Sequence, residues 1–274
     1  MIHLGLIGYP LGHSLSPKIQ AAALKACGLK GDYSLFSIHS DDTQGLKDLL
    51  NRIRTKEILG LNVTIPHKQK VIALLDEMTD TAKSIGAVNT IYLRDEKLIG
   101  DNTDAPGFLS DLKRFLTNEV QKHRDLNALV LGAGGSARAV VYALLSDGWS
   151  VTIAARRIEQ AQELAFQFEN ARAIEFNFQI FKPSSFNLLV NTTPVGMIPN
   201  TDQSPWPENS PFPQAAIYDL VYNPRETKLV RDARAQGLSA TTGLGMLIEQ
   251  AALGFELWTG YKPLKDILYT SVVE

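Results

Sequence analysis

The chain has 274 residues, long enough for one large domain or two of ordinary size, and we expect two. Its formal net charge is −2 with no basic run, which gives no electrostatic footprint for a nucleic-acid partner. The single cysteine, Cys27, excludes an internal disulfide, and no cysteine and histidine residues have the spacing of a zinc site. The sequence shows neither a signal peptide nor an apolar run of membrane-spanning length. These features predict a cytoplasmic protein without a metal and without a membrane partner.

The first half of the chain alternates strand-like and helix-like segments, which is typical of parallel β–α–β units. The strand-like runs are residues 3–8, 32–38, 59–65 and 87–93, and the helical stretches include residues 16–28 and 43–53. This order predicts an N-terminal α/β domain with a mainly parallel sheet.

Two serines lie beside the start of the first predicted helix. Ser16 is a natural N-cap because Pro17, in the first turn, needs no N–H partner. A helix N-terminus carries partial positive charge and free N–H donors, so Ser14 and Ser16 form a candidate site for a substrate carboxylate. Capping and ordinary loop chemistry remain the alternative explanation of both serines.

Polar residues then follow the next strands. Thr64 and Lys68 lie at the carboxyl end of the run 59–65, where open α/β sheets bind their ligands. A lysine in such a cleft can hydrogen-bond a substrate oxygen and exchange a proton with it, although a lone lysine is often only solvated. Asn89, Asn102 and Asp104 supply amide and carboxylate groups suited to a polyol, although these residue types are also common in turns.

A second α/β block starts near Leu126. The apolar run that begins at Leu129 stops at Gly132 and Gly134 and resumes as a helix, which is typical of a strand, a phosphate-binding turn and a helix. About 20 residues further, where an acidic side chain would select NAD, the chain has Arg156 and Arg157 instead. Two guanidinium groups suit the 2′-phosphate of NADP, although two solvated surface arginines would have the same sequence.

The remaining elements complete this block and return to the first one. Strands are expected within 150–156, 186–193 and 215–222, with an irregular surface connection at 203–214. The last helical stretch, 246–260, is expected to pack on the first block. We therefore expect a discontinuous substrate-binding and catalytic domain of residues 1–105 plus 240–274, and a Rossmann-like NADP-binding domain of residues 106–239.

The motifs occur together in an order that resembles the shikimate dehydrogenase family, the NADP-dependent enzymes of aromatic amino-acid biosynthesis. They are SLSP at 14–17, NVTIPHK at 62–68, GAVNT at 86–90, DNTD at 101–104, GAGGSAR at 132–138, NTTPVGM at 191–197, YDLVYNP at 218–224 and GLGMLIEQ at 243–250. The resemblance covers essentially the whole chain. It implies two domains with an active-site cleft between them, and reversible reduction of 3-dehydroshikimate by NADPH to shikimate.

The resemblance also implies a role for each matching residue. Lys68 and Asp104 would form the catalytic pair beside the reacting carbon, with Lys68 as general acid and base. The other substrate contacts would be Ser14, Ser16 and Tyr222 at the carboxylate, and Thr64, Asn89 and Gln250 at the ring hydroxyls. The cofactor contacts would be Gly132, Ala133, Gly134, Gly135 and Ser136 at the turn, Arg156 and Arg157 at the 2′-phosphate, and Thr192, Leu220 and Gly243 on the nicotinamide side.

One departure from the family pattern concerns the cofactor. The family commonly has Asn-Arg-Thr where this chain has Ala155, Arg156 and Arg157, and Gln160 stands where members often have another arginine. NADP is still expected over NAD, with the strictness of that selectivity left open.

The sequence leaves two rival functions and the assembly undecided. The rivals are a quinate dehydrogenase and a catalytically silent NADPH-binding regulator. The two serines favour shikimate, and the intact Lys68 and Asp104 favour an enzyme. His13 and His67 are expected to be structural or loop residues. The chain is expected to act on a small molecule, as a monomer or a homodimer.

Overall fold

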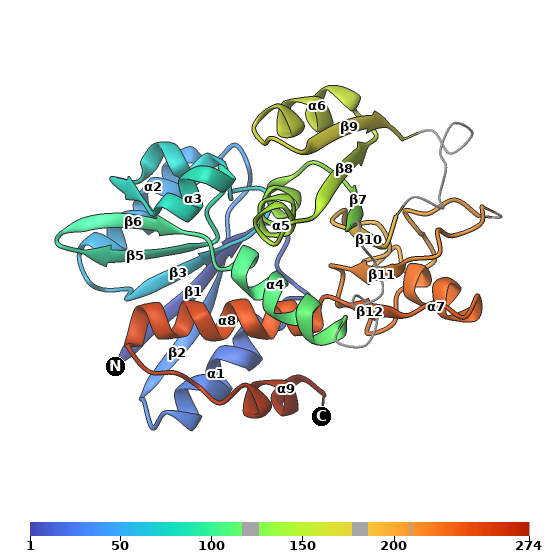
Figure 1. Ribbon diagram of the computed structural model, residues 1–274. Helices are drawn as coiled ribbons and strands as arrows, with labels where there is room; N and C mark the ends of the chain where they lie inside the picture. The colour runs from blue at the N-terminus through green and yellow to red at the C-terminus, as the bar shows by residue number, and fades with distance from the viewer. Residues whose placement is uncertain (117–125, 177–185, 209, 274) are drawn as a thin grey trace. The chain divides into compact units, whose positions relative to one another are not determined.

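The computed structural model describes residues 1–116, 126–176, 186–208 and 210–273. The chain divides into two compact units, Met1–Gly107 with Ile248–Glu274, and Phe108–Leu247. Each unit contains one six-stranded sheet with helices (Figure 1). The expected α/β fold class with two mainly parallel sheets is confirmed.

The sheet of the first unit has the strand order β2-β1-β3-β5-β6-β4. Strands β2, β1 and β3 are parallel, whereas β5 runs antiparallel to both β3 and β6. The strands are β1 (Ile2–Gly8), β2 (Gly31–Ser37), β3 (Gly60–Val63), β4 (Glu77–Met78), β5 (Thr90–Arg94) and β6 (Lys97–Asp101). The helices are α1 (Ser16–Ala26), α2 (Thr43–Arg54), the 3₁₀ helix Lys70–Leu74, α3 (Asp80–Ile85), the start of α4 (Asp104–Phe115), most of α8 (Leu244–Thr259) and α9 (Lys265–Val273).

The antiparallel hairpin of β5 and β6 was not expected from the sequence. A two-residue turn joins the strands, and Asp95 and Glu96 both have positive φ angles there, 51° and 60°. Tight hairpin turns of this kind usually carry Asn-Gly or Asp-Gly, so the sequence gives no signal for this one. The hairpin matters for the site because β6 brings the chain back to the end of the sheet at which β5 begins.

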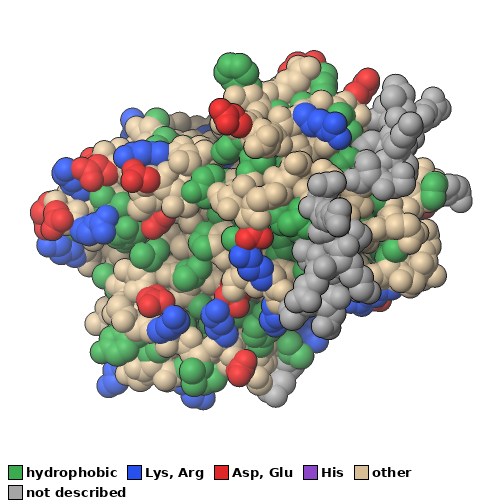
Figure 2. Space-filling view, viewed as in Figure 1, with side chains coloured by type: hydrophobic (Ala, Val, Ile, Leu, Met, Phe, Trp, Pro, Cys, Tyr) green, Lys and Arg blue, Asp and Glu red, His purple; other side chains and the backbone are tan. Residues whose placement is uncertain are grey.

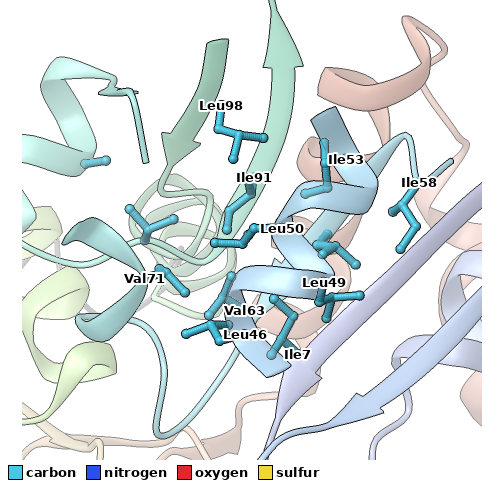
Figure 3. Close-up of a cluster of buried hydrophobic side chains, with 13 residues drawn as sticks. Ile7, Leu46, Leu49, Leu50, Ile53, Ile58, Val63, Val71, Ile91 and Leu98 are labelled. Carbon is cyan, nitrogen blue, oxygen red and sulfur yellow. The ribbon is translucent and has the colours of Figure 1, made fainter. Parts of the chain in front are cut away.

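The core of the first unit is built on α2. Leu46, Leu49, Leu50 and Ile53 follow the spacing of one helical face, and all are at most 4% exposed. They pack with residues of β1, β3, β5 and β6, namely Ile7, Leu61, Val63, Ile91 and Leu98 (Figure 3). This packing fixes the strands whose ends carry the candidate catalytic residues.

The second unit is a doubly wound sheet of parallel strands with the order β12-β11-β10-β7-β8-β9. Its strands are β7 (Asn127–Leu131), β8 (Ser150–Ala155), β9 (Ala171–Glu175), β10 (Leu188–Asn191), β11 (Ala216–Asp219) and β12 (Ala240–Thr242). Its helices include α5 (Gly135–Ser146), α6 (Ile158–Phe166) and α7 (Lys228–Ala235). The strand order reverses between β7 and β10, and such a switch point is where sheets of this type bind ligands.

The connection 203–214 differs from the expected surface loop. Its described residues form no helix or strand, but Trp206 and Phe212 are 3% and 7% exposed and belong to the core of the second unit. Their rings stack with centroids 5.4 Å apart. The prediction of a surface connection is therefore wrong for these two residues, because large aromatic rings bury themselves even when the backbone is irregular.

Charged side chains show no single-sign patch on the face drawn in Figure 2, where lysines and arginines are interspersed with acidic residues. Within the described part of the chain, no helix is both long enough and apolar enough to cross a membrane.

Candidate active site

Lys68 and Asp104 form a buried ion pair. Lys68 Nζ donates to Asp104 Oδ2 at 2.6 Å, and the two side chains are only 10% and 7% exposed. Lys68 follows β3, and Asp104 is the first residue of α4, just after β6. The structure thus places an ammonium group and a carboxylate together where little water reaches them, which is the arrangement needed for a controlled proton transfer.

Asn89 holds the second oxygen of Asp104. Its Nδ2 donates to Asp104 Oδ1 at 2.9 Å and lies 3.4 Å from Gln250 Oε1. Its Oδ1 accepts from the backbone N–H of Thr103 at 2.7 Å. Because Thr103 N can only donate, the Asn89 amide is fixed in one orientation. Lys68, Asp104, Asn89 and Gln250 are therefore joined in one buried network.

The other predicted substrate residues of the first unit lie at one end of its sheet, where β1 and β3 finish. Ser14 and Ser16 follow β1, and Thr64 directly follows β3, which is parallel to β1. The loops after these strands are linked, since Tyr9 N donates to Ile65 O at 2.9 Å. Asn89 precedes β5, which is antiparallel to β3, so it lies at the same end.

One expectation about a helix start is wrong in detail. Ser16 is the first residue of α1 and not its N-cap; the cap is Leu15, and Ser14 Oγ accepts from Ser16 N at 3.2 Å. Ser14 therefore accepts the N–H of the first helical residue, Ser16. Asn102, predicted as a polyol ligand, instead uses both ends of its side chain on backbone, donating to Ala87 O and accepting from Ala105 N.

His67 has the structural environment that was expected. It is 1% exposed, and its Nε2 donates to Ile38 O at 2.7 Å. This bond ties the segment that precedes Lys68 to the end of β2. Among the described residues, no three histidine, cysteine or acidic side chains gather into a possible metal site.

The glycine turn of the second unit has the shape of a phosphate cradle. Gly132 has φ of 108°, and a Cβ there would meet Thr192 Oγ1 at 2.6 Å, so only glycine fits. A Cβ on Gly134 would meet nothing within 4 Å, which leaves open space beside the turn. Helix α5 starts at Gly135, and no side chain caps it. The N–H groups at the start of a helix suit a diphosphate.

The remaining predicted cofactor residues surround this turn or follow neighbouring strands. Ala133 lies between the glycines, Ser136 lies in the first turn of α5, and the exposed Arg156 and Arg157 follow β8 directly. Thr192 and Leu220 follow β10 and β11, and a Cβ on Gly243 would lie 2.2 Å from Leu220 O. This donor set, with two arginines and no carboxylate at the end of β8, fits NADP.

Tyr222 follows β11 in the second unit, whereas the other predicted substrate residues lie in the first.

Comparison with known proteins identifies the family. The model for the shikimate dehydrogenase substrate-binding domain matches residues 6–91, the model for shikimate/quinate 5-dehydrogenase matches 114–182, and the model for the shikimate 5′-dehydrogenase C-terminal domain matches 243–270. The shikimate dehydrogenase (NADP(+)) of Carboxydothermus hydrogenoformans is 42% identical, over 98% of this chain and 95% of that protein. The chain belongs to the shikimate dehydrogenase family.

Two solved structures of relatives share its fold. The shikimate 5-dehydrogenase of Thermus thermophilus, in complex with NADP(H) and shikimate, is 39% identical with a TM-score of 0.87, covering 99% of this chain and 98% of that one. The quinate dehydrogenase of Corynebacterium glutamicum, in complex with NAD, is 31% identical with a TM-score of 0.87, covering 99% and 98%. Both activities therefore occur on the fold of the shikimate dehydrogenase family.

The sequence analysis missed several residues that organise the site of this family member. Asn62 is 5% exposed and donates towards Asn89 O and Thr90 Oγ1, while Tyr33 Oη donates to Asn62 Oδ1 at 2.8 Å. Asn62 and Thr90 lie within quoted motifs, but the sequence gives no sign that their side chains point to Asn89. Tyr33 is 29 residues from Asn62 along the chain, so only the pairing of strands reveals that contact.

Proposed function

We propose that this member of the shikimate dehydrogenase family catalyses the reversible, NADP-dependent oxidation of shikimate to 3-dehydroshikimate, in the pathway to chorismate and the aromatic amino acids. The observation that carries the proposal is the buried Lys68–Asp104 pair, held by Asn89 at the ligand-binding edge of the sheet. The comparisons support the substrate and the cofactor, since curated relatives over nearly the whole chain are NADP-dependent shikimate dehydrogenases.

The first unit supplies the groups that bind and orient the substrate. Ser14 and Ser16, with the start of α1, hold the carboxylate, and the phenol of Tyr222 assists. Thr64, Asn89 and Gln250 hydrogen-bond the ring hydroxyls, and their fixed orientations select one face of the ring. Asn89 is suited to this role because its network leaves its side chain little freedom.

Lys68 performs the proton transfer. In the oxidation, Lys68 Nζ accepts the proton of the reacting hydroxyl as its carbon becomes a carbonyl; in the reduction, it returns that proton to the carbonyl oxygen. When bound, NADP would supply the redox chemistry, as hydride acceptor in the oxidation and as hydride donor in the reduction. Asp104 keeps Lys68 Nζ in place through the hydrogen bond of 2.6 Å between them.

The second unit supplies the groups that hold NADP. Its diphosphate lies on the turn formed by Gly132, Ala133, Gly134, Gly135 and Ser136. Arg156 and Arg157 bind the 2′-phosphate, and Thr192, Leu220 and Gly243 lie on the nicotinamide side. In this segment the chain has two arginines where the family commonly has one. The second arginine adds a positive charge in place of the missing asparagine contact.

We assign the substrate-binding and catalytic role to residues 1–105 plus 240–274, and the NADP-binding role to residues 106–239. The division into Met1–Gly107 with Ile248–Glu274 and Phe108–Leu247 supports this assignment, with the second boundary inside α8. We further propose that the protein works in the cytoplasm as a monomer or a homodimer, with no nucleic-acid or membrane partner.

Oxidation of quinate is the second candidate function, because a relative of equal TM-score is a quinate dehydrogenase. Quinate carries an additional hydroxyl on the carbon that bears the carboxylate. The paired Ser14 and Ser16 support shikimate. A silent regulator is disfavoured by the intact Lys68–Asp104 bond.

The test is to incubate the purified protein with NADP and either shikimate or quinate, and to identify the organic product by mass spectrometry. The proposal expects reduced cofactor together with a product lighter than shikimate by two hydrogen atoms. Product from quinate alone would assign the second function. Cofactor binding without product from either acid would assign the regulator.

A further inference from the structure

The carboxyl edge of the second sheet contains a buried pair that the proposed mechanism does not use. Asn191 and Asp219 are the last residues of β10 and β11, lie opposite each other in register, and are both 0% exposed. Asn191 Nδ2 donates to Asp219 Oδ1 at 2.8 Å. The pair therefore joins the ends of the two strands beside the switch point.

The Asp219 carboxylate also organises the chain that follows it. Its Oδ1 accepts from the backbone N–H of Val221 at 3.0 Å, and its Oδ2 accepts from Thr227 Oγ1 at 2.7 Å. Thr227 in turn caps α7 by accepting from Val230 N. One carboxylate thus fixes the turn after β11 and the start of the next helix.

Asn191 organises the neighbouring loop in the same way. Its Oδ1 accepts from both the backbone N–H and the hydroxyl of Thr193, at 2.9 and 2.7 Å. Thr193 Oγ1 accepts from Val195 N at 3.3 Å. Since Oδ1 faces donors and Nδ2 faces a carboxylate, the amide has only one satisfied orientation.

The two loops that this pair fixes carry residues assigned to the nicotinamide side. Thr192 lies between Asn191 and Thr193, and its hydroxyl donates to Leu131 O at 2.7 Å, next to Gly132. Leu220 lies between Asp219 and Val221, and Leu220 N donates to Asn191 O at 2.9 Å. A shift of either buried side chain would therefore move a residue assigned to the cofactor.

We propose that Asn191 and Asp219 form a positioning pair that holds Thr192 and Leu220 in the geometry needed to bind the nicotinamide half of NADP. The inference rests on the proposed function, since it concerns the cofactor assigned there. Burial raises the pKa of the Asp219 carboxyl to about 6. The hydrogen bonds from Thr227, Val221 and Asn191 act in the opposite direction but do not cancel this effect. A buried carboxylate is a poor source of stability compared with apolar packing, so its place here points to orientation of the loops.

The test compares direct NADP binding, by calorimetry on the ligand-free full chain at pH 8, for the wild type and Asp219→Ala. The substitution leaves Asn191 Nδ2, Val221 N and Thr227 Oγ1 without their acceptor. Because the loops that carry Thr192 and Leu220 then lose their anchor and are less preorganised for the cofactor, the Kd for NADP is expected to rise by about tenfold. The KM for shikimate is expected to change far less than the KM for NADP.

Asn187→Ala is the matched control. Asn187 directly precedes β10, at the end opposite Asn191, and its Oδ1 accepts from Asn127 N at 2.9 Å. This variant also loses a hydrogen bond between strands and is expected to lower the Tm, but to keep the Kd for NADP within about twofold of the wild type, because it touches neither loop. An equal loss of affinity in both variants would assign Asp219 a merely structural role and overturn the proposal.

A conservative variant remains informative even where Asp219→Ala does not fold. Asp219→Asn keeps the shape of the side chain, and its amide oxygen can still accept from Asn191 Nδ2 and Val221 N while its NH₂ faces the Thr227 hydroxyl, which can accept. This variant is expected to keep the Kd for NADP within about threefold of the wild type. An Asp219→Asn variant that loses tenfold or more in affinity although these acceptor contacts are kept would overturn the proposal.

These readouts separate the pair from the proposed function. A wild type that binds NADP but does not oxidise shikimate contradicts the proposed function, while the Kd comparison still decides the role of the pair. A wild type that does not bind NADP contradicts the assigned cofactor itself.

Discussion

Replacing Asp104 by Asn tests the buried network most sharply, because the two side chains have the same shape. Asp104 accepts from Lys68 Nζ on one oxygen, at 2.6 Å, and from Asn89 Nδ2 on the other, at 2.9 Å. An amide has only one acceptor oxygen, so its NH₂ group must point at either Lys68 Nζ or Asn89 Nδ2. Either arrangement places two hydrogen-bond donors against each other. A flip of Asn89 does not relieve this conflict, because its NH₂ would then face Thr103 N.

The cost follows from the burial of these groups. Hydrogen bonds to charged groups contribute about 1.5–3 kcal/mol each, and the Lys68 and Asp104 side chains are only 10% and 7% exposed, so water replaces little of the loss. We expect Asp104→Asn to lower the free energy of unfolding by about 2 kcal/mol. For a protein of this size, that corresponds to a Tm lower by about 4–8 °C.

Urea unfolding of the ligand-free protein, followed by circular dichroism, measures this difference. The double variant Asn89→Asp with Asp104→Asn is the control, because the new carboxylate accepts from Thr103 N and from the new amide, whose oxygen then accepts from Lys68. It is expected to recover most of the lost stability. An Asp104→Asn variant as stable as the wild type, or a double variant less stable than the single one, would refute the described network.

Four further outcomes are expected. Lys68→Ala should lower kcat by about 10²–10⁴-fold in steady-state assays while changing the KM for shikimate far less; equal losses in both would contradict its acid–base role. Arg156→Ala with Arg157→Ala should raise the KM for NADP but not that for NAD, and a parallel rise for both cofactors would exclude contact with the 2′-phosphate. Gly132→Ala, strained at φ 108°, should weaken NADP binding measured by calorimetry, and unchanged affinity would place the diphosphate elsewhere. Burial raises the pKa of Asp219 from 3.8 to about 6, so the folded protein binds the carboxyl proton more tightly than the unfolded chain does. The resulting contribution to stability is full below pH 4 and is lost as the pH rises through 6. The unfolding free energy of the wild type relative to Asp219→Asn should therefore fall by about 3 kcal/mol from pH 4 to pH 7, and a difference independent of pH would contradict the raised value.

Local signals in the sequence predicted much of the fold. The run that stops at Gly132 and Gly134 predicted a strand, a turn and a helix, and the structure has β7, the turn and α5 there. The apolar face of α2 follows helical spacing and is buried as a unit. Such patterns are readable because each depends on residues close together in the chain.

The missed features have different physical origins, and one is a contact between distant residues. Asp219 and Asn191 are separated by 28 residues, and only the parallel pairing of β10 and β11 makes them neighbours. Ser16 has the composition of an N-cap, but the backbone places the cap one residue earlier, so Ser14 accepts its N–H. Trp206 is buried although its segment has no regular structure.

The candidate site was predicted partly from residue chemistry and partly from resemblance. Strand ends alone pointed to Lys68 and Asp104, but the same reasoning also selected Asn102, whose side chain is used on backbone. Strand ends also pointed to Asn89, whereas Gln250 came from the resemblance, and the structure places Asn89 Nδ2 2.9 Å from Asp104 Oδ1 and 3.4 Å from Gln250 Oε1. The orientation of Asn89 by Thr103 could be seen only in the structure.

The most direct test of the proposed function is one set of kcat/KM values for the purified protein, measured with shikimate and with quinate, each with NADP and with NAD. The account predicts that shikimate with NADP exceeds the other three combinations clearly. A higher value for quinate would contradict the roles of Ser14 and Ser16, a higher value for NAD would contradict those of Arg156 and Arg157, and no turnover in any combination would contradict the assignment as an enzyme.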